Sequence, residues 1–140
     1  MKRLAVLPVL LLALAACSDD AKPAASTVPT GNTTISYQLM TPAEGKELID
    51  SGVELTIIDV RTPEEFAAGH LGGAVNSDIE GGKFSAYIAT IDKDATYVVY
   101  CHSGRRAALA AQAMADAGFT DVHDIGGIAD WQAAGYPVVQ

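Results

Sequence analysis

The sequence predicts a three-layer α/β domain, in which helices flank a parallel sheet of about five short strands. Between residues 37 and 140, short apolar strand candidates alternate with helix candidates. Such alternation is typical of parallel strands joined by right-handed crossovers. Two strand candidates, residues 55–60 and 96–100, are apolar on both faces, as buried strands of a parallel sheet are. A chain of 140 residues has room for one such domain.

The first half of the domain contains two helices whose starts are marked by capping boxes. A short strand is predicted at residues 37–40. The Thr-Pro-Ala-Glu segment at 41–44 then places threonine at the N-cap, proline at the first helical position and glutamate at the third. This pattern predicts a helix that ends at Ser51. The Thr-Pro-Glu-Glu segment at 62–65 follows the next strand and predicts a second, shorter helix in the same way.

The second half of the domain continues the alternation. Brief strands are predicted at residues 74–76 and 122–125, in addition to the buried strand at 96–100. The longest predicted helix carries one apolar stripe, as a helix packed against a sheet does. Three helices are predicted here, at residues 84–91, 104–117 and 128–134.

Residues 1–16 have the composition of an export signal. Lys2 and Arg3 precede an apolar run, residues 4–16, that is shorter than the roughly 20 residues that a membrane-spanning helix needs. The Leu-Ala-Ala-Cys segment that ends at Cys17 resembles the lipobox of bacterial lipoproteins. This resemblance implies cleavage before Cys17 and diacylation of its thiol. The alternative is an ordinary signal peptide with an incidental cysteine.

Residues 17–36 are predicted to be a flexible, lipidated tether, because they contain almost no large apolar side chain. The full chain has a net charge of −8, and removal of residues 1–16 with their two basic residues would change it to −10. So acidic a protein is unsuited to nucleic acid and to anionic lipid surfaces. We therefore expect an exported protein that is attached to a bacterial membrane by acyl chains. Its domain would face the periplasm or the cell exterior.

The most reactive segment of the domain follows the strand that ends at Tyr100. Six residues, Cys101 to Arg106, lead from this strand to the next helix, and ligands of parallel sheets bind at this edge. A helix N-terminus and neighbouring arginines favour the thiolate form of cysteine, which is the nucleophile. Arg105 and Arg106 also suit an anionic substrate. The alternative is that Cys101 is a small buried apolar residue at a strand end.

Several motifs, in the right order and spacing, together resemble a rhodanese domain. They cover nearly all of residues 37–139 and leave out the signal and the tether. The motifs are Asp59-Val60-Arg61, Glu65-Phe66, the segment from Gly69 and His70 to Asn76, the Cys101–Arg106 loop, and Gly126-Gly127-Ile128 with Trp131.

The resemblance implies a sulfurtransferase. Cys101 would take a sulfane sulfur from a donor such as thiosulfate, form a persulfide, and pass the sulfur to cyanide or a thiol. The backbone N–H groups of the loop residues His102, Ser103, Gly104, Arg105 and Arg106 would surround the thiolate or persulfide. Arg105, Arg106 or both would attract and orient the anionic donor, and Arg106 would also brace the loop. No metal or organic cofactor is implied. The remaining motif positions would be architectural: Asp59, Arg61, Glu65, His70, Gly126, Gly127 and Trp131.

Two other classes of function are weighed against this one. The domain could be a non-catalytic or sulfur-carrier module that docks a partner protein. Phosphatases and arsenate reductases have a similar loop of the form Cys-x5-Arg, one residue longer than the Cys101–Arg106 loop, which makes room for a tetrahedral oxyanion. A phosphatase also needs a general acid, and the sequence offers only generic carboxylates. The shorter loop therefore favours sulfur transfer.

Overall fold

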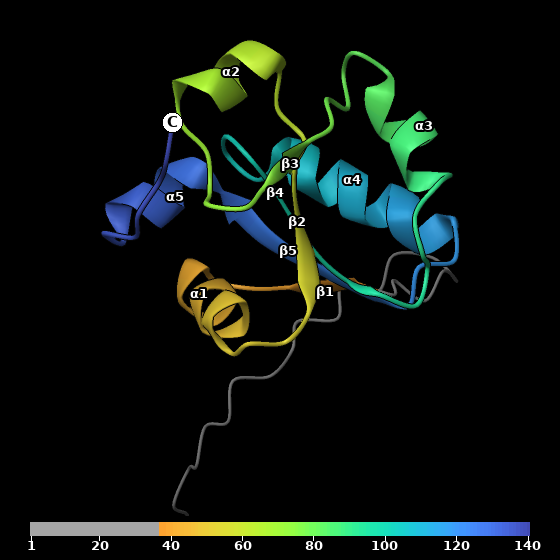
Figure 1. Ribbon diagram of the computed structural model, residues 1–140, viewed down its shortest axis with the longest axis horizontal. Helices are drawn as coiled ribbons and strands as arrows, with labels where there is room; N and C mark the ends of the chain where they lie inside the picture. The colour runs from red at the N-terminus through yellow and green to blue at the C-terminus, as the bar shows by residue number, and fades with distance from the viewer. Residues whose placement is uncertain (1–36) are drawn as a thin grey trace, which may run out of the picture.

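A computed structural model describes residues 37–140, in which five strands alternate with five helices (Figure 1). The predictions for the signal segment 1–16, for the tether 17–36 and for lipidation of Cys17 lie outside the described residues. Within the described part of the chain, no helix is long and apolar enough to cross a membrane.

The strands form one sheet with the order β1-β5-β4-β2-β3, and every neighbouring pair is parallel. This arrangement confirms the predicted fold class. Strand bounds lie within one or two residues of those predicted, and β4 and β5 run further than expected. The strands are β1 (Tyr37–Leu39), β2 (Leu55–Asp59), β3 (Val75–Asn76), β4 (Thr96–Cys101) and β5 (Asp121–Gly127).

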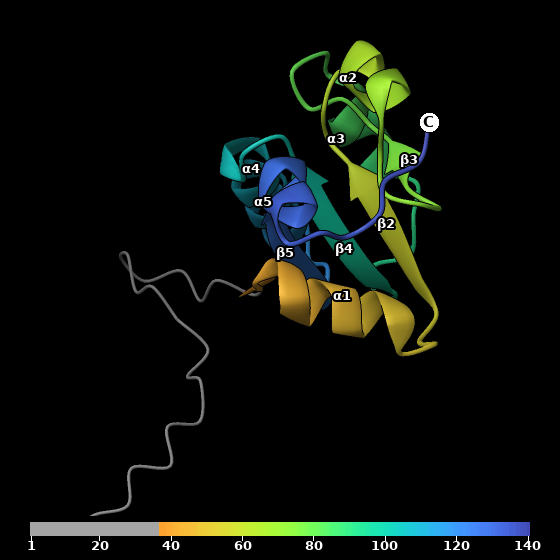
Figure 2. The ribbon, with the colours of Figure 1, turned by 90° about the vertical axis from the view of Figure 1, so that its left-hand side faces the viewer.

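Helices lie on both faces of this sheet, which gives the three predicted layers (Figures 1 and 2). One buried cluster joins the sheet to α3 and α4, and a second joins the opposite face to α1 and α5. The third helix is shorter than predicted. The helices are α1 (Pro42–Asp50), α2 (Pro63–Ala68), α3 (Lys83–Ile88), α4 (Arg105–Asp116) and α5 (Ile128–Ala133).

Both predicted capping boxes are present. The hydroxyl of Thr41 accepts a hydrogen bond from the backbone N–H of Glu44, and the Glu44 carboxylate accepts one from the backbone N–H of Thr41. Thr62 and Glu65 make the same pair of bonds at the start of α2. The short α2 therefore begins at a defined residue, which fixes the position of Glu65 in its first turn.

Residues of β4 alternate between the two buried clusters. Val98 and Tyr100 face α1 and α5, whereas Val99 and Cys101 face α3 and α4. Cys101 was predicted to lie in a loop after the strand. It is instead the last residue of β4, because it pairs with Gly127 across a β-bulge between the two central strands. This pairing anchors the thiol at the carboxyl edge of the sheet.

Candidate active site

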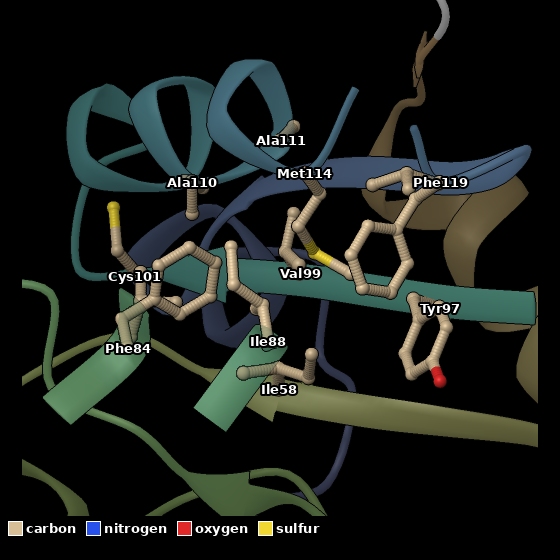
Figure 3. Close-up of a cluster of buried hydrophobic side chains, with 13 residues drawn as sticks. Ile58, Phe84, Ile88, Tyr97, Val99, Cys101, Ala110, Ala111, Met114 and Phe119 are labelled. Carbon is tan, nitrogen blue, oxygen red and sulfur yellow. The ribbon is translucent and has the colours of Figure 1, made fainter. Parts of the chain in front are cut away.

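Cys101 occupies the junction between β4 and α4. Its side chain packs at the end of the apolar cluster, beside Phe84 (Figure 3), and the residue is only 1% exposed. The backbone N–H of Gly104 donates a hydrogen bond to its Sγ at 3.1 Å. Gly104 has a φ of +95°, a conformation that side chains rarely adopt, so this residue lets the chain curl around the sulfur. Cys101 is thus buried at the end of a strand, and its Sγ is in contact with the loop that follows.

Gly126 and Gly127 hold the loop from the neighbouring strand. A Cβ on Gly127 would lie 2.5 Å from the carbonyl oxygen of His102 and 2.7 Å from the Cα of Ser103. The same carbonyl of His102 accepts a hydrogen bond from Ala129 in α5, at 3.3 Å. The two glycines were expected to provide turn geometry and core packing. The structure shows in addition that Gly127 allows β5 to approach the backbone of the loop.

Arg106 is held by two glutamates. Its guanidinium donates to both carboxylate oxygens of Glu65 at 2.7 and 2.8 Å, and to Glu80 at 3.2 Å. The hydrogen bonds from Arg106 lower the pKa of Glu65 to about 2, and the carboxylates raise the pKa of Arg106. These contacts fit the bracing role predicted for Arg106, because they connect the start of α4 to α2. Donor binding by Arg106 would compete with Glu65.

The exposed part of the loop carries the other polar groups. His102, Ser103 and Arg105 are exposed, whereas Gly104 and Arg106 are half-buried. Within residues 37–140, the structure pairs Arg105 with no carboxylate. Arg105 is therefore the loop cation that faces solvent. Both arginines were candidates for attracting the donor, and the structure distinguishes them.

Asp59 and Arg61 form a buried ion pair at the end of β2. The Nε and one terminal nitrogen of Arg61 donate to the Asp59 carboxylate at 2.6 to 3.0 Å, and the same terminal nitrogen reaches the carbonyl of Gly69 at 2.7 Å. Asp59 is fully buried and Arg61 is 4% exposed. The guanidinium also lies 5.6 Å from the centre of the Tyr100 ring. This network ties the end of β2 to the segment after α2, as the architectural interpretation expected.

His70 and Trp131 also make structural contacts. The His70 ring stacks on Phe66 with 3.8 Å between ring centres, and its Nδ1 lies 3.0 Å from the carbonyl oxygen of Phe66. Its backbone pairs with Val139 near the C-terminus. Trp131 is buried and donates its indole N–H to the carbonyl of Pro137 at 3.0 Å. Both residues fasten the C-terminal segment to the domain.

Two carboxylates near the loop were not singled out from the sequence. Glu80 reaches Arg106 from the segment before α3, and no local spacing indicates that contact. Asp124, in β5, is 1% exposed, and its Oδ1 accepts a hydrogen bond from Gly126 at 2.8 Å, whereas its Oδ2 is buried without a hydrogen-bond partner among the described residues. Burial raises the pKa of Asp124 to about 6. The same strand also contains Asp121 and His123, so the local sequence does not single out Asp124.

The described residues contain no group of three or more histidine, cysteine, aspartate or glutamate side chains that could hold a metal ion. The arrangement at the loop suits a different kind of chemistry. A thiol at a strand end, with a backbone N–H directed at its sulfur and a helix N-terminus behind it, suits nucleophilic attack and stabilisation of the resulting anion.

The protein is an α/β domain in which a cysteine lies at the carboxyl edge of a five-stranded parallel sheet, next to the start of a helix. The Rhodanese-like domain family matches residues 41–134. The chain is similar to the thiosulfate sulfurtransferase GlpE of Pseudomonas aeruginosa, with 32% identity over 102 residues, which cover 72% of this chain and 88% of the relative. The chain therefore belongs to the rhodanese-like domain family.

Solved structures agree with this assignment. A rhodanese-related protein from Thermoplasma volcanium is 31% identical and superposes with a TM-score of 0.62, over 71% of this chain and 95% of that protein. A protein from Rhodopseudomonas palustris, described as a possible tyrosine phosphatase, is 28% identical with a TM-score of 0.65, over 81% of this chain and all of that protein. The two descriptions correspond to two of the function classes weighed from the sequence.

Proposed function

We propose that the protein is a sulfurtransferase that carries a sulfane sulfur on Cys101. The observation that carries the proposal is the hydrogen bond from the Gly104 backbone N–H to the Cys101 Sγ, inside a six-residue loop that leads into α4. An N–H directed at sulfur stabilises both a thiolate and the terminal sulfur anion of a persulfide. The similarity to a thiosulfate sulfurtransferase supports the same activity.

The proposed reaction has two displacements and needs no outside oxidant or reductant. The Cys101 thiolate attacks the outer sulfur of thiosulfate, a new S–S bond forms, the old S–S bond breaks, and sulfite leaves with the electron pair. Cyanide or a thiolate then attacks the terminal sulfur of the persulfide, and the Cys101 thiolate leaves. The N–H of Gly104 would stabilise the sulfur anion in both steps, while Arg105 would attract the anionic donor.

Thiocyanate production from thiosulfate and cyanide tests the activity, with Cys101→Ala as the inactive control. Intact-mass spectrometry after exposure to a sulfane donor tests the intermediate, because the persulfide adds the mass of one sulfur atom. A wild-type rate no higher than that of Cys101→Ala would exclude thiosulfate–cyanide transfer. A stable sulfur adduct with poor turnover would instead support the carrier function.

Phosphatase activity is the second candidate, since one similar structure carries that description. The six residues from Cys101 to Arg106 argue against it, because the loops of phosphatases are one residue longer. Arg106 is also held by Glu65 on both terminal nitrogens, so it would have to exchange a carboxylate for a phosphate. Hydrolysis of an aryl phosphate that depends on Cys101 would support this candidate instead.

We also propose that Cys17 anchors the domain to a membrane after removal of residues 1–16. The support is the Leu-Ala-Ala-Cys segment at the end of the apolar run. Expression of the full chain and of Cys17→Ala in a bacterial host tests this proposal. The native chain should sediment with membranes, and the variant should be released into the soluble exported fraction. Equal partition of the two would refute lipid anchoring.

A further inference from the structure

The surface around the Cys101–Arg106 loop carries less positive charge than its two arginines suggest. We call this surface the entrance, and its charged residues are Arg105, Arg106, Glu65 and Glu80. Arg106 donates to Glu65 through both terminal nitrogens and to Glu80 through one of them. One guanidinium therefore faces two carboxylates, so this group of three side chains has a net charge of −1. With the exposed Arg105 added, the four charges around the entrance sum to zero.

The two glutamates do different things. Glu65 makes a two-point ion pair and is the partner that holds Arg106 in place, with 31% of its side chain exposed. Glu80 makes a single, longer contact at 3.2 Å, and 63% of its side chain is exposed. An exposed ion pair of this kind contributes little to stability. Arg106 is already neutralised by Glu65, so the charge of Glu80 offsets that of the exposed Arg105 beside the loop.

We infer that Glu80 is a specificity-determining residue that disfavours dianionic sulfur donors at Cys101. This inference rests on the proposed sulfurtransferase function and concerns the substrate class. Thiosulfate brings two negative charges toward an entrance at which the two arginines are offset by two carboxylates. A small hydropersulfide, R–S–SH with an uncharged R group, carries at most one negative charge and meets less repulsion. The Cys101 thiolate attacks the outer sulfur of R–S–SH, a new S–S bond forms, and the old S–S bond breaks. The R–S⁻ group leaves with the electron pair and takes up the proton.

The experiment compares two donors on three proteins. The rate constant for persulfide formation on Cys101 is measured by intact mass with thiosulfate and with the hydropersulfide of 2-mercaptoethanol. The proteins are the wild type, Glu80→Gln, and the control Glu54→Gln. Glu54 is exposed and immediately precedes β2, so it lies at the amino ends of the strands, whereas Cys101 lies at the carboxyl ends. The control therefore changes the net charge of the protein equally, but far from the entrance.

Glu80→Gln should react with thiosulfate about fivefold faster than the wild type, as expected for one charge removed near a dianion in a dielectric close to that of water. The rate with the hydropersulfide, which carries at most one charge, should stay within about twofold. The gain should shrink at high ionic strength, because salt screens exposed charges. Glu54→Gln should react like the wild type with both donors.

Three outcomes would overturn the inference: an unchanged thiosulfate rate in Glu80→Gln, an equal change with both donors, or a gain that salt does not reduce. Each of these requires that a persulfide forms, so each leaves the proposed function standing. Failure of both donors to modify Cys101 in any of the proteins would instead refute the proposed function and, with it, this inference.

Discussion

Asp124 is expected to make the stability of the domain depend on pH in an unusual direction. Burial raises its pKa from 3.8 to about 6, and one of its carboxylate oxygens has no hydrogen-bond partner among the described residues. The folded protein therefore holds the Asp124 proton more tightly than the unfolded chain does. The stabilisation is complete below pH 3.8 and is lost as the pH rises through 6.

The size of this effect follows from the two pKa values. A difference of one pKa unit corresponds to 1.36 kcal/mol, so ionisation of Asp124 reduces the free energy of unfolding by about 3 kcal/mol in total, of which about 2.5 kcal/mol falls between pH 4 and pH 8. Asp124→Asn has nearly the same shape, keeps an oxygen for the N–H of Gly126, and carries no charge at any pH. Its stability should lack this pH dependence.

Urea unfolding of the wild type and Asp124→Asn at several pH values between 4 and 8 measures the effect. Carboxylates other than Asp124 titrate in both proteins, so the difference between the two free energies of unfolding isolates this residue. That difference should shift by about 2.5 kcal/mol in favour of the variant as the pH rises. A shift below about 1 kcal/mol would mean that Asp124 ionises in the folded protein much as an exposed aspartate does, and would refute the reasoning.

Three further substitutions test the contacts around the loop. Gly127→Ala places a Cβ 2.5 Å from the carbonyl oxygen of His102. It should cost about 1–3 kcal/mol of stability and slow the formation of the persulfide, as measured by mass spectrometry. Gly72→Ala, whose Cβ would lie 4.0 Å from its nearest neighbour, should do neither. Glu65→Gln should cost at most about 1 kcal/mol at pH 7, because the pair with Arg106 is partly exposed; since the pKa of Glu65 is lowered to about 2, the cost in urea unfolding should shrink as the pH falls from 5 to 3, and a constant cost would contradict a charge effect. Arg61→Met leaves the Asp59 charge buried and should cost about 3–5 kcal/mol in the same assay, part of which Asp59→Asn in addition should restore.

The features that the sequence predicted well depend on neighbours a few residues apart. Both capping boxes join residues three positions apart, and both are present in the structure. The alternation of apolar strands and helices likewise defined the sheet and its two covered faces. The end of β4 was placed one residue too early, because the pairing of Cys101 with Gly127 joins two strands that are distant in the sequence.

The charges around the entrance could not be predicted, for the same physical reason. Arg106 meets Glu65 and Glu80 across separations of 41 and 26 residues, and no periodicity connects positions so far apart. Both arginines were therefore candidates for attracting an anionic donor, and the partners through which Arg106 braces the loop were not predicted. Folding brings two carboxylates to Arg106, which changes the expected preference for the donor rather than the identity of the nucleophile.

Burial of Cys101 has a consequence for how the proposed persulfide would work. The thiol is only 1% exposed, packed at the end of the core beside Phe84. The persulfide adds one S–S bond, so its terminal sulfur extends beyond the position of Sγ. The loop residues His102, Ser103 and Arg105 are exposed, so we expect an acceptor to approach over them. The buried position would restrict access of large reagents to the free thiol, while the terminal sulfur, further out, would be the atom that an acceptor reaches.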